Sequence, residues 1–550
     1  MKKLSFALLS VFSLLIIPGD ADERPNILWI TSEDNASHWL ACYGNKDAST
    51  PVLDSLAAGG LKFTHAYSNG PVCAVARSTI LNGAYAVTQG TQHMRSRYPI
   101  PASFKGHASY LREMGYYCTN NSKTDYNFKG NDASIWDDCS GKAHYKNRPP
   151  GKPFFAIFNL TITHESNLFP DVVQRNRKGG VIPDPPRLDP KTLQLPPHQP
   201  DLPEFREDTA IYHDCVTAMD KQAGGILKEL RERGLAEDTI VFYYSDHGGA
   251  TARGKRYLQD TGVRVPLIIH LPEKWRHLSP FKPGQAVGEM VSFVDLAPTL
   301  LSICGMPTPG SMQGRAFLGK HRKSPPEDES VFLFADRFDE SPGMRRAITN
   351  GRWKYIRCFS PHLPGAPYCE YPLGQPSWKA WQRAAADGKL QGHTAELWKI
   401  PRPVEYLYDL DSDPWEIRNL AEVAAHQSQL EMMRNQLSHK MKETRDSGVI
   451  PETMWPEILK TTTLHEHVEK HLPQHPEWVN LAFAATAKDF SPDLVKALGS
   501  RSEVLLYWAA MGCLFHAKEA AAAKDMLIPL KDHPSETVSK AAAMALDAIQ

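Results

Sequence analysis

The sequence predicts an α/β protein built on a large, mostly parallel sheet that is sandwiched by helices. Strand-like apolar runs at 25–32 and 239–245 alternate with helix-like runs at 214–233 and 294–303. This alternation is typical of strand–helix–strand units, whose helices cover both faces of the sheet. The 550 residues are enough for several domains, and an apolar content of 42% is ordinary for a globular protein.

An apolar segment opens the chain. Lys2 and Lys3 precede the apolar run 4–17, and the small-residue stretch 18–21 follows it. This order of residues is typical of a secretory signal peptide over 1–21, which predicts export to the periplasm or out of the cell. A membrane anchor is the alternative, but the run is too short to favour it, and no later stretch is long and apolar enough to span a bilayer.

Possible metal ligands follow two of the strand-like runs. They are Glu33 and Asp34, directly after 25–32, and Asp246 and His247, directly after 239–245. Open α/β sheets hold ligands at the carboxyl ends of their strands. Carboxylates with one imidazole suit a hard divalent cation such as Ca²⁺ better than Zn²⁺. Alternatively, Asp34 and Asp246 cap helices or turns, but the presence of both motifs favours a metal site.

A candidate nucleophile lies at the start of a helix-like run. Cys73, in the segment Pro71–Thr79, is followed four residues later by Arg77. Residues i and i+4 share one face of a helix, so the Arg77 guanidinium would stabilise an anionic oxygen at position 73. The alternative is a buried structural thiol, which is common in segments of small residues.

Together these motifs resemble the formylglycine-dependent sulfatase family of the alkaline-phosphatase-like superfamily. The resemblance extends from Pro25 to the segment Tyr406–Leu410. It implies that a formylglycine-generating maturation enzyme oxidises Cys73 to formylglycine, with Arg77 as the partner of that residue. It also implies a calcium ion, bound by Glu33, Asp34, Asp246 and His247.

The same resemblance implies roles for three further side chains. Lys123 and Lys255 match lysines that contact sulfate, and His164 matches a histidine that hydrogen-bonds sulfate or the leaving oxygen. In the implied reaction, one hydroxyl of the formylglycine hydrate attacks sulfur and expels an alcohol, and loss of a proton from the second then eliminates sulfate. Solvated lysines and a core histidine are the alternatives, but the order and spacing of the three favour the functional roles.

Several positions depart from the family pattern. Val75 replaces the proline that the maturation enzyme usually reads. Glu33 replaces the first aspartate of the acidic pair, which lengthens that ligand by one methylene, and His247 stands where many members have asparagine. We expect metal binding to survive both changes.

Asp125 holds the place of a histidine that often lies two residues after the first lysine. A bare carboxylate there would repel sulfate, so Asp125 must be protonated or pair with Lys123 if it enters the site. We expect the substrate pocket to include Asp125 together with His93 and Arg95, which lie in loops near the matched segments.

The sequence predicts a catalytic domain over 22–345 and a smaller C-terminal part over 346–464. Segments 348–356 and 406–410 resemble the small antiparallel sheet at the C-terminus of sulfatases. Between them, the Pro-, Gly- and Trp-rich segment 359–397 is long for a structureless connection. Its tryptophans either stack on sugar rings at the substrate rim or bury themselves against the domain.

Alanine-rich helical sequence fills the last part of the chain, 465–550. Its helix pairs with small residues at their contacts resemble a short stack of HEAT-like repeats. We expect this tail to dock on the catalytic domain, and a partner-binding surface is the alternative.

The sequence thus predicts an exported sulfatase that acts on O- or N-linked sulfate of a sulfated carbohydrate. The alternatives are a phosphoester or phosphonate hydrolase of the same superfamily, and a non-catalytic sugar-binding relative in which Cys73 stays a thiol. The formal net charge of zero gives no support for nucleic-acid binding. The eight cysteines besides Cys73 permit disulfides in an oxidising compartment without implying any pairing.

Overall fold

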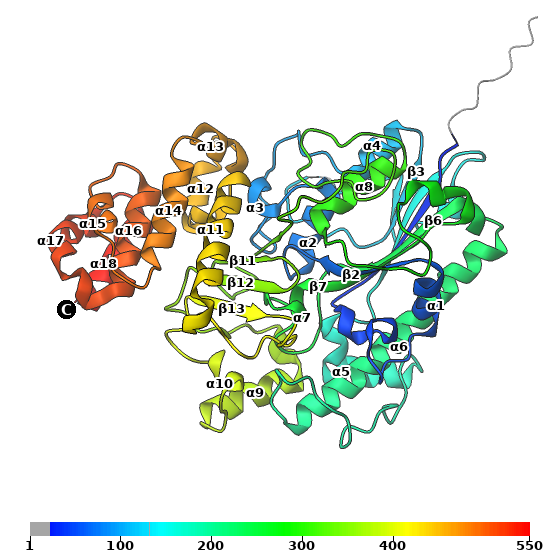
Figure 1. Cartoon of the computed structure of the whole chain (residues 1–550), viewed down its shortest axis with the longest axis horizontal. Helices are drawn as coiled ribbons and strands as arrows, with labels where there is room; N and C mark the ends of the chain where they lie inside the picture. The colour runs from blue at the N-terminus through cyan, green and yellow to red at the C-terminus, as the bar shows by residue number, and fades with distance from the viewer. Residues whose placement is uncertain (1–22, 131, 550) are drawn as a thin grey trace, which may run out of the picture.

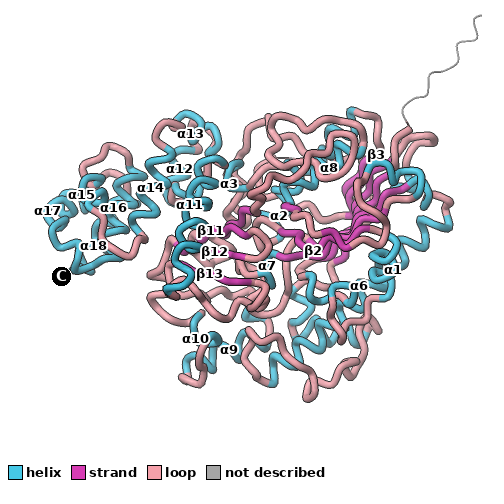
Figure 2. The backbone as a smooth tube through the Cα atoms, viewed as in Figure 1, coloured by secondary structure: helices cyan, strands magenta, loops and turns pink. Residues whose placement is uncertain are grey.

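The computed structural model describes residues 23–130 and 132–549. It shows a broad α/β body with a group of helices at one side (Figure 1). Its strands form two sheets, one large and one small (Figure 2). The signal peptide predicted over 1–21 lies outside the described residues.

The larger sheet has nine strands and is mostly parallel, which confirms the prediction. Its order is β4-β3-β5-β1-β6-β7-β2-β8, and β9 also pairs with β2. The strands are β1 (Asn26–Ser32), β2 (Leu61–Tyr67), β3 (Tyr117–Asn121), β4 (Asp138–Cys139), β5 (Phe154–Leu160), β6 (Thr239–Ser245), β7 (Arg264–His270), β8 (Ala286–Val287) and β9 (Val291–Ser292). β7 runs antiparallel to both of its neighbours, β6 and β2.

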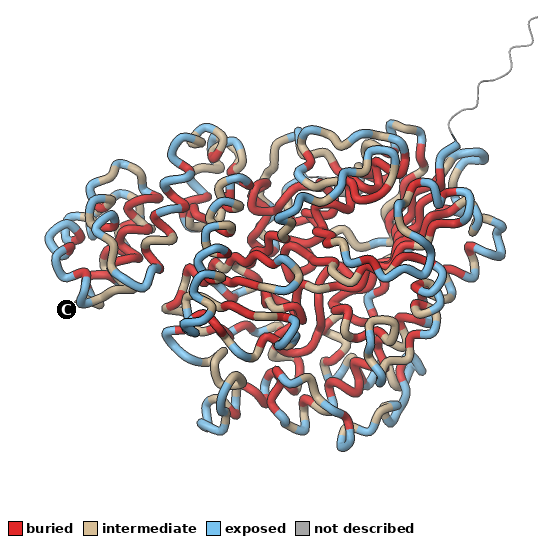
Figure 3. Tube along the Cα trace, in the orientation of Figure 1, coloured by how far each residue is buried: buried red, intermediate tan, exposed pale blue. Residues whose placement is uncertain are grey.

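β1 lies in the middle of this sheet, between β5 and β6. All residues of β1 and β6 are buried (Figure 3), because helices cover both faces of the sheet. This double burial explains their continuous apolar runs in the sequence. Ser32 pairs in register with Leu160 of β5 and Ser245 of β6, so the three strands end at one level. The residues that follow them therefore emerge at the same edge of the sheet.

Two helical layers cover the sheet, as predicted. One contains α2 (Cys73–Asn82), α4 (His107–Glu113) and α8 (Leu296–Ile303), whose apolar side chains share a core with Ile27 and Trp29 of β1. The other contains α1 (Pro51–Gly59), α5 (Pro170–Lys178) and α6 (Pro203–Glu232), which share a core with Leu28 and Ile30. Successive β1 side chains thus face opposite layers, as the two-residue period of a strand requires.

The second sheet is antiparallel, in agreement with the prediction of a small C-terminal sheet. Its strands, in spatial order, are β10 (Val331–Ala335), β11 (Arg345–Thr349), β12 (Trp353–Cys358) and β13 (Glu405–Asp409). It begins at Val331, earlier than residue 346, where we expected the C-terminal part to start. β10 is a short apolar run like those of the large sheet, so the sequence does not reveal that it pairs with β11 instead.

The segment 359–397 is partly helical. It contains α9 (Pro376–Ala386) and α10 (His393–Glu396). Trp381 is fully buried and Trp378 is 8% exposed, and both pack in a small core with Phe205 of α6. These two indole rings therefore pack inside the protein and do not offer a face to a sugar. Two short helices elsewhere are α3 (Ala86–Gln89) and α7 (Asp260–Val263).

Helices fill most of 427–549, at the left of Figure 1, which agrees with the prediction of a helical tail over 465–550 and extends it toward the N-terminus. We call 427–549 the helical part. Its helices are α11 (Gln427–Glu443), α12 (Trp455–Ile458), α13 (Leu464–Lys470), α14 (His475–Ala485), α15 (Pro492–Ala497), α16 (Glu503–His516), α17 (Lys524–Leu527) and α18 (Glu536–Ile549). Phe359, just after β12, packs edge-on against Phe483 and Trp508. The helical part thus continues the core of the small sheet.

Two further predictions concern spans and disulfides. In residues 23–130 and 132–549, no helix is long and apolar enough to cross a bilayer. All nine cysteines lie within these ranges, and each is a free thiol.

Candidate active site

Four segments bring the predicted site residues to one edge of the large sheet. Glu33 and Asp34 follow β1, His164 follows β5, Asp246 and His247 follow β6, and Cys73 begins α2. Because β5, β1 and β6 end at one level, residues distant in the sequence come into contact. The Asp34 backbone N–H, for example, donates to Asp246 Oδ1 at 3.3 Å across 212 positions.

Cys73 lies at the centre of this cluster. Its Sγ is 3.3 Å from His247 Nε2, 3.6 Å from Lys255 Nζ and 3.9 Å from Asp34 Oδ1. Burial raises the pKa of the thiol, but Lys123 and Lys255 outweigh burial and lower the pKa to about 7. Position 73 is thus a buried place where the protein stabilises an anion or a nucleophile.

Asp34, Asp246 and His247 form a compact set of possible metal ligands. His247 Nε2 lies 3.0 Å from Asp34 Oδ1 and 3.7 Å from Asp246 Oδ1. His247 Nδ1 lies 2.9 Å from the Gly248 carbonyl oxygen, which can only accept, so Nδ1 donates and Nε2 faces the carboxylates. Burial lowers the pKa of His247, but Asp246 and Asp34 raise it to about 10. The two carboxylates thus direct negative charge at one place, and the oxygen-rich donor set fits a hard divalent cation.

Two cations hold the carboxylates at the border of this set. Arg77 Nε donates to Asp246 Oδ2 at 3.0 Å, and Arg77 Nη2 lies 3.6 Å from Glu33 Oε1. Lys123 Nζ lies 2.7 Å from the same Glu33 oxygen. Arg77 therefore orients carboxylates of the predicted metal site. Glu33 is held by two cations, and among the described residues the convergent groups of ligand atoms include Asp34, Asp246 and His247 but not Glu33.

Lys255 connects Cys73 to His164. Its Nζ lies 3.2 Å from His164 Nε2 and 3.0 Å from Glu165 Oε1. His164 Nδ1 lies 3.3 Å from the Ser166 backbone N and 2.8 Å from Ser166 Oγ, and these contacts orient the ring. The Lys255 ammonium and His164 Nε2 thus meet beside Cys73.

The structure does not bring His93 or Arg95 into this cluster. His93 packs on Trp455, with ring centroids 4.5 Å apart, and its Nδ1 lies 3.6 Å from Glu452 Oε2. Arg95 is exposed. His93 therefore belongs to the contact between the catalytic part and the C-terminal helices, a contact that its position in the sequence does not reveal.

Asp125 is half-buried, with a φ of 53°. The described residues show no hydrogen bond or ion pair between Asp125 and Lys123. Lys123 pairs with Glu33 instead. Of the two conditions on Asp125, protonation or pairing with Lys123, the described residues do not show the second.

Two further site residues stand outside the sequence motifs. Glu165 is 1% exposed and pairs with Lys255 and with Arg256, whose Nη1 lies 2.9 Å from Glu165 Oε2. Asn159 Oδ1 accepts from Arg77 Nη1 at 2.7 Å. The one available signal was that Glu165 directly follows the matched His164, at the end of a buried strand.

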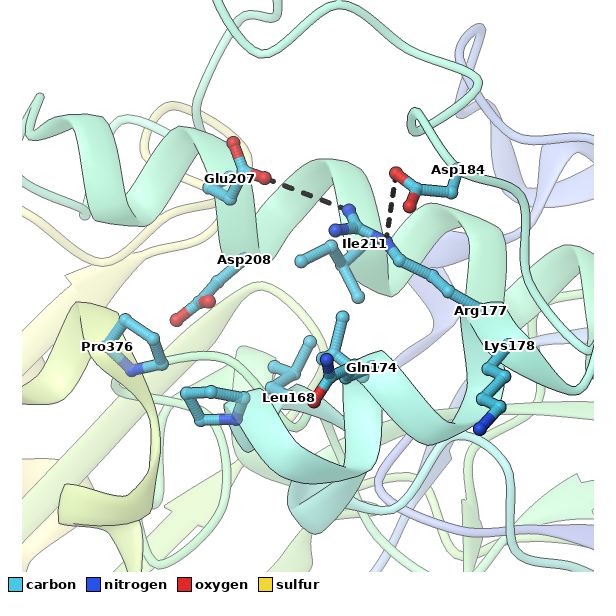
Figure 4. Close-up of a pocket in the computed structure, with 11 residues that line it drawn as sticks. Leu168, Gln174, Arg177, Lys178, Asp184, Glu207, Asp208, Ile211 and Pro376 are labelled. Carbon is cyan, nitrogen blue, oxygen red and sulfur yellow. Dashed lines mark ion pairs between the residues drawn. The ribbon is translucent and has the colours of Figure 1, made fainter.

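A separate cavity of about 590 Å³ lies between α5 and α6 (Figure 4). Arg177 pairs there with Asp184 at 3.7 Å and with Glu207 at 3.8 Å. Asp208 lines the same cavity, and burial raises the pKa of its carboxyl to about 7. The Cys73 cluster contributes no lining residue, so this cavity is distinct from the candidate active site.

Comparisons with known proteins agree with the geometry. The Sulfatase family profile matches residues 25–306. An ulvan-active sulfatase from Formosa agariphila is 34% identical over 468 residues, which cover 78% of this chain and 77% of that protein. The human N-sulphoglucosamine sulphohydrolase is 25% identical over 505 residues, which cover 81% of this chain and 97% of that protein.

Solved structures share the fold. One, in complex with its substrate D-glucosamine-2-N,6-O-disulfate, has a TM-score of 0.54 and 17% identity and covers 77% of this chain and 98% of that chain. The phosphonate monoester hydrolase of Silicibacter pomeroyi has a TM-score of 0.53 and 17% identity. Its match covers 78% of this chain and 97% of that chain. At these identities the likeness shows the fold alone. The family profile and the 34% identical relative show more: this chain belongs to the sulfatase family and is a sulfuric ester hydrolase.

Proposed function

We propose that this enzyme is an exported sulfatase that removes sulfate from a sulfated carbohydrate, with formylglycine formed from Cys73 and one calcium ion. The ion would be held by the predicted ligands Glu33, Asp34, Asp246 and His247. The position of Cys73 carries the proposal, because its Sγ lies within hydrogen-bonding distance of an imidazole and an ammonium group at the carboxyl ends of the strands. A sulfate ester that approaches position 73 would meet positive charge on its oxygens.

Lys123 and Lys255 would bind the sulfate oxygens. Burial lowers the pKa of both ammonium groups, but Cys73 and Glu33 raise that of Lys123, and Asp34 and Cys73 raise that of Lys255. The net pKa of each lies above its usual value, so both lysines stay charged at neutral pH. Fixed charges in a buried site stabilise an anion more strongly than the same charges in water.

His164 would protonate the leaving alcohol. Its Nε2 lies 3.2 Å from Lys255 Nζ, which in turn lies 3.6 Å from Cys73 Sγ. The pKa of His164 is lowered by burial and by Lys255, but Asp34 and Cys73 outweigh them and raise it above its usual value. This shift favours the protonated imidazole that a general acid requires.

Two groups complete the proposed centre. Bound calcium would supply a Lewis acid that neutralises charge on the sulfate oxygens. Formylglycine would supply a hydroxyl nucleophile at position 73. Lys123, Lys255 and His164 then bind the sulfate oxygens and hold the leaving oxygen near a proton, and Arg77 keeps the Asp246 carboxylate in place.

The relatives support a sulfated carbohydrate as the substrate class. The matched proteins include an ulvan-active sulfatase and an N-sulphoglucosamine sulphohydrolase. A phosphonate hydrolase shares the fold, so phosphoester or phosphonate hydrolysis remains the alternative reaction. A non-catalytic sugar-binding role has less support, because Cys73, His164 and Lys255 are all present and meet in one cluster.

Peptide mass spectrometry and a matched pair of substrates test the proposal. For the first test, the protein is to be produced in a host that matures related enzymes. We expect the mass loss at Cys73 that marks conversion of the thiol to the aldehyde. We also expect hydrolysis of 4-nitrophenyl sulfate, little hydrolysis of 4-nitrophenyl phosphate, and no turnover by Cys73→Ala. An unmodified thiol with no sulfate release would overturn the proposal, and faster phosphate release would favour the alternative.

Export and the form of the tail are part of the same proposal. Residues 1–21 would direct export, which fractionation of cells that express the chain with and without them would test.

In the tail, α14 packs on α16 and α16 packs on α18, which supports a HEAT-like stack of helices.

A further inference from the structure

A small cavity lies beside the active site, between β11 and the segment that contains α9. Its lining includes Arg256, Arg345, Cys369 and Trp398. Arg256 directly follows Lys255, whose ammonium group contacts Cys73. One residue of the cavity lining is therefore the direct neighbour in the chain of a residue of the candidate sulfate site.

The surroundings of Arg345 indicate that this cavity could bind an anion. Its Nη2 donates to the Arg256 carbonyl oxygen at 3.0 Å, and its guanidinium lies 5.7 Å from the centre of the Tyr257 ring. Its Nε is buried with no acceptor in hydrogen-bonding reach, and no carboxylate in the described ranges pairs with it. The next residue, Arg346, by contrast forms ion pairs with two aspartates. Arg345 is half-buried, and its buried Nε donor stays unpaired unless a ligand supplies an acceptor.

Two more donors near this cavity lack acceptors. Trp398 lines it, and its Nε1 is buried with no hydrogen-bond partner among the described residues. Arg402 is 6% exposed, and its Nε is likewise unpaired. Burial, more than the charge of Arg402, lowers the pKa of Arg345 to about 10. The unpaired donors of Arg345, Trp398 and Arg402 call for a ligand with oxygen acceptors, which a carboxylate or sulfate supplies.

We propose that Arg345 and Trp398 form a subsite for a second anionic group, a carboxylate or a sulfate, on the carbohydrate whose sulfate is removed at position 73. This inference rests on the proposed function. The planar guanidinium of arginine matches the oxygens of either group. Tyr368, 65% exposed on the cavity lining, offers an aromatic face to a sugar ring. The enzyme would therefore prefer substrates that carry an anion besides the one it cleaves.

A binding experiment tests the subsite without catalysis. Crystals of the full chain are soaked in selenate, an analogue of sulfate that anomalous scattering locates. We expect a peak at Arg345 that is lost in Arg345→Gln and kept in Arg352→Gln, a matched control on the exposed turn before β12. No peak at Arg345, or a peak that persists in Arg345→Gln, overturns the proposal. A peak beside Lys255 reports separately on the proposed sulfate site.

Kinetics test the preference and identify the anion. The substrate is a sulfated oligosaccharide that contains a uronic acid, compared with its carboxyl-reduced form and with a form that lacks the second sulfate. We expect Arg345→Gln to raise KM about tenfold more for the oligosaccharide than for 4-nitrophenyl sulfate, with a small change in kcat. The form on which the variant and wild type no longer differ shows which anion the subsite binds.

Two results separate the possible failures. Equal effects of Arg345→Gln on the oligosaccharide and on 4-nitrophenyl sulfate would overturn the subsite. Absence of sulfate release from any ester by the wild-type protein would overturn the proposed function, and the selenate experiment would still decide whether Arg345 binds an anion.

Discussion

Lys255 Nζ lies 3.0 Å from Glu165 Oε1 inside the active site, where both side chains are almost fully buried. The same carboxylate pairs with Arg256, and the Glu165 backbone N–H donates to Asp34 Oδ2 at 2.8 Å. Glu165 thus links two cations to the predicted metal site. It acts through Lys255, as a positioning residue.

Glu165→Gln should impair the enzyme through Lys255. We expect kcat/KM to fall about 10–100-fold, by analogy with the loss of outer-shell partners at metal sites. We also expect the free energy of unfolding to fall by about 3–5 kcal/mol, because two buried cations each lose one of their two carboxylate partners. Steady-state kinetics and chemical denaturation measure the two effects.

Glu165→Asp, which keeps the charge, should recover part of both losses, and the exposed Glu232→Gln should change neither. If Glu165→Gln lost stability but kept full kcat/KM, the carboxylate would have a structural role only.

His164→Asn should affect substrates according to their leaving group. Nitrophenolate leaves without a proton, whereas a sugar alkoxide needs one, so removal of a general acid harms the sugar substrate more. We expect the loss in kcat to be at least about 10²-fold greater for a sugar sulfate than for 4-nitrophenyl sulfate. Equal losses on both substrates would assign His164 to sulfate binding alone.

Calcium should stabilise the protein as well as support activity. After treatment with a chelator, we expect activity to be lost and then restored by Ca²⁺. Thermal melting should shift upward with Ca²⁺, since a ligand at 100 times its Kd adds about 2.7 kcal/mol to the free energy of unfolding. Asp246→Asn should abolish the shift, and Asp238→Asn, outside the cluster, should retain it. A shift that survives in Asp246→Asn would place the ion elsewhere.

Asp208 should make stability depend on pH. Burial raises its folded-state pKa to about 7, from 3.8. The folded state therefore holds the proton more tightly than the unfolded state, so this contribution to stability is full below pH 3.8 and is lost as pH rises through 7. The difference is up to about 4 kcal/mol.

Asp208→Asn removes the titration and keeps an acceptor for the Ser377 backbone N–H, which lies 2.9 Å from Asp208 Oδ2. Chemical denaturation at pH 4, 6 and 8 should show the variant gaining stability over wild type as pH rises. A difference that is constant across this range would contradict the assignment.

Arg346 should be essential to the contact between the small sheet and the C-terminal helices. It is fully buried and pairs with Asp446, after α11, and with Asp336, after β10. Arg346→Met should reduce the free energy of unfolding by about 3–5 kcal/mol, because two buried aspartates lose the cation that pairs with both of them. Arg352→Met, at an exposed pair, should change it by less than about 1 kcal/mol. Similar losses in the two variants would show that the buried network adds little.

The sequence predicted the large sheet and most of the cluster because both leave local signals. A strand covered on both faces is a continuous apolar run, and ligands follow the ends of such strands, so the sequence indicates Asp34 and Asp246. For His93 and Arg95 the sequence offers only their nearness to matched segments. The structure separates them from Cys73, because the chain between them turns toward the C-terminal helices.

The sequence by itself determined the order of strands and helices, the family, and the residue types available at the site. Only the tertiary structure decided that Glu165 holds Lys255, that Lys123 pairs with Glu33, and that Arg345 shares a cavity with Trp398. The physical reason is range: apolar periodicity is a property of neighbouring residues, whereas the partner of a charge is set by packing between segments far apart in the chain.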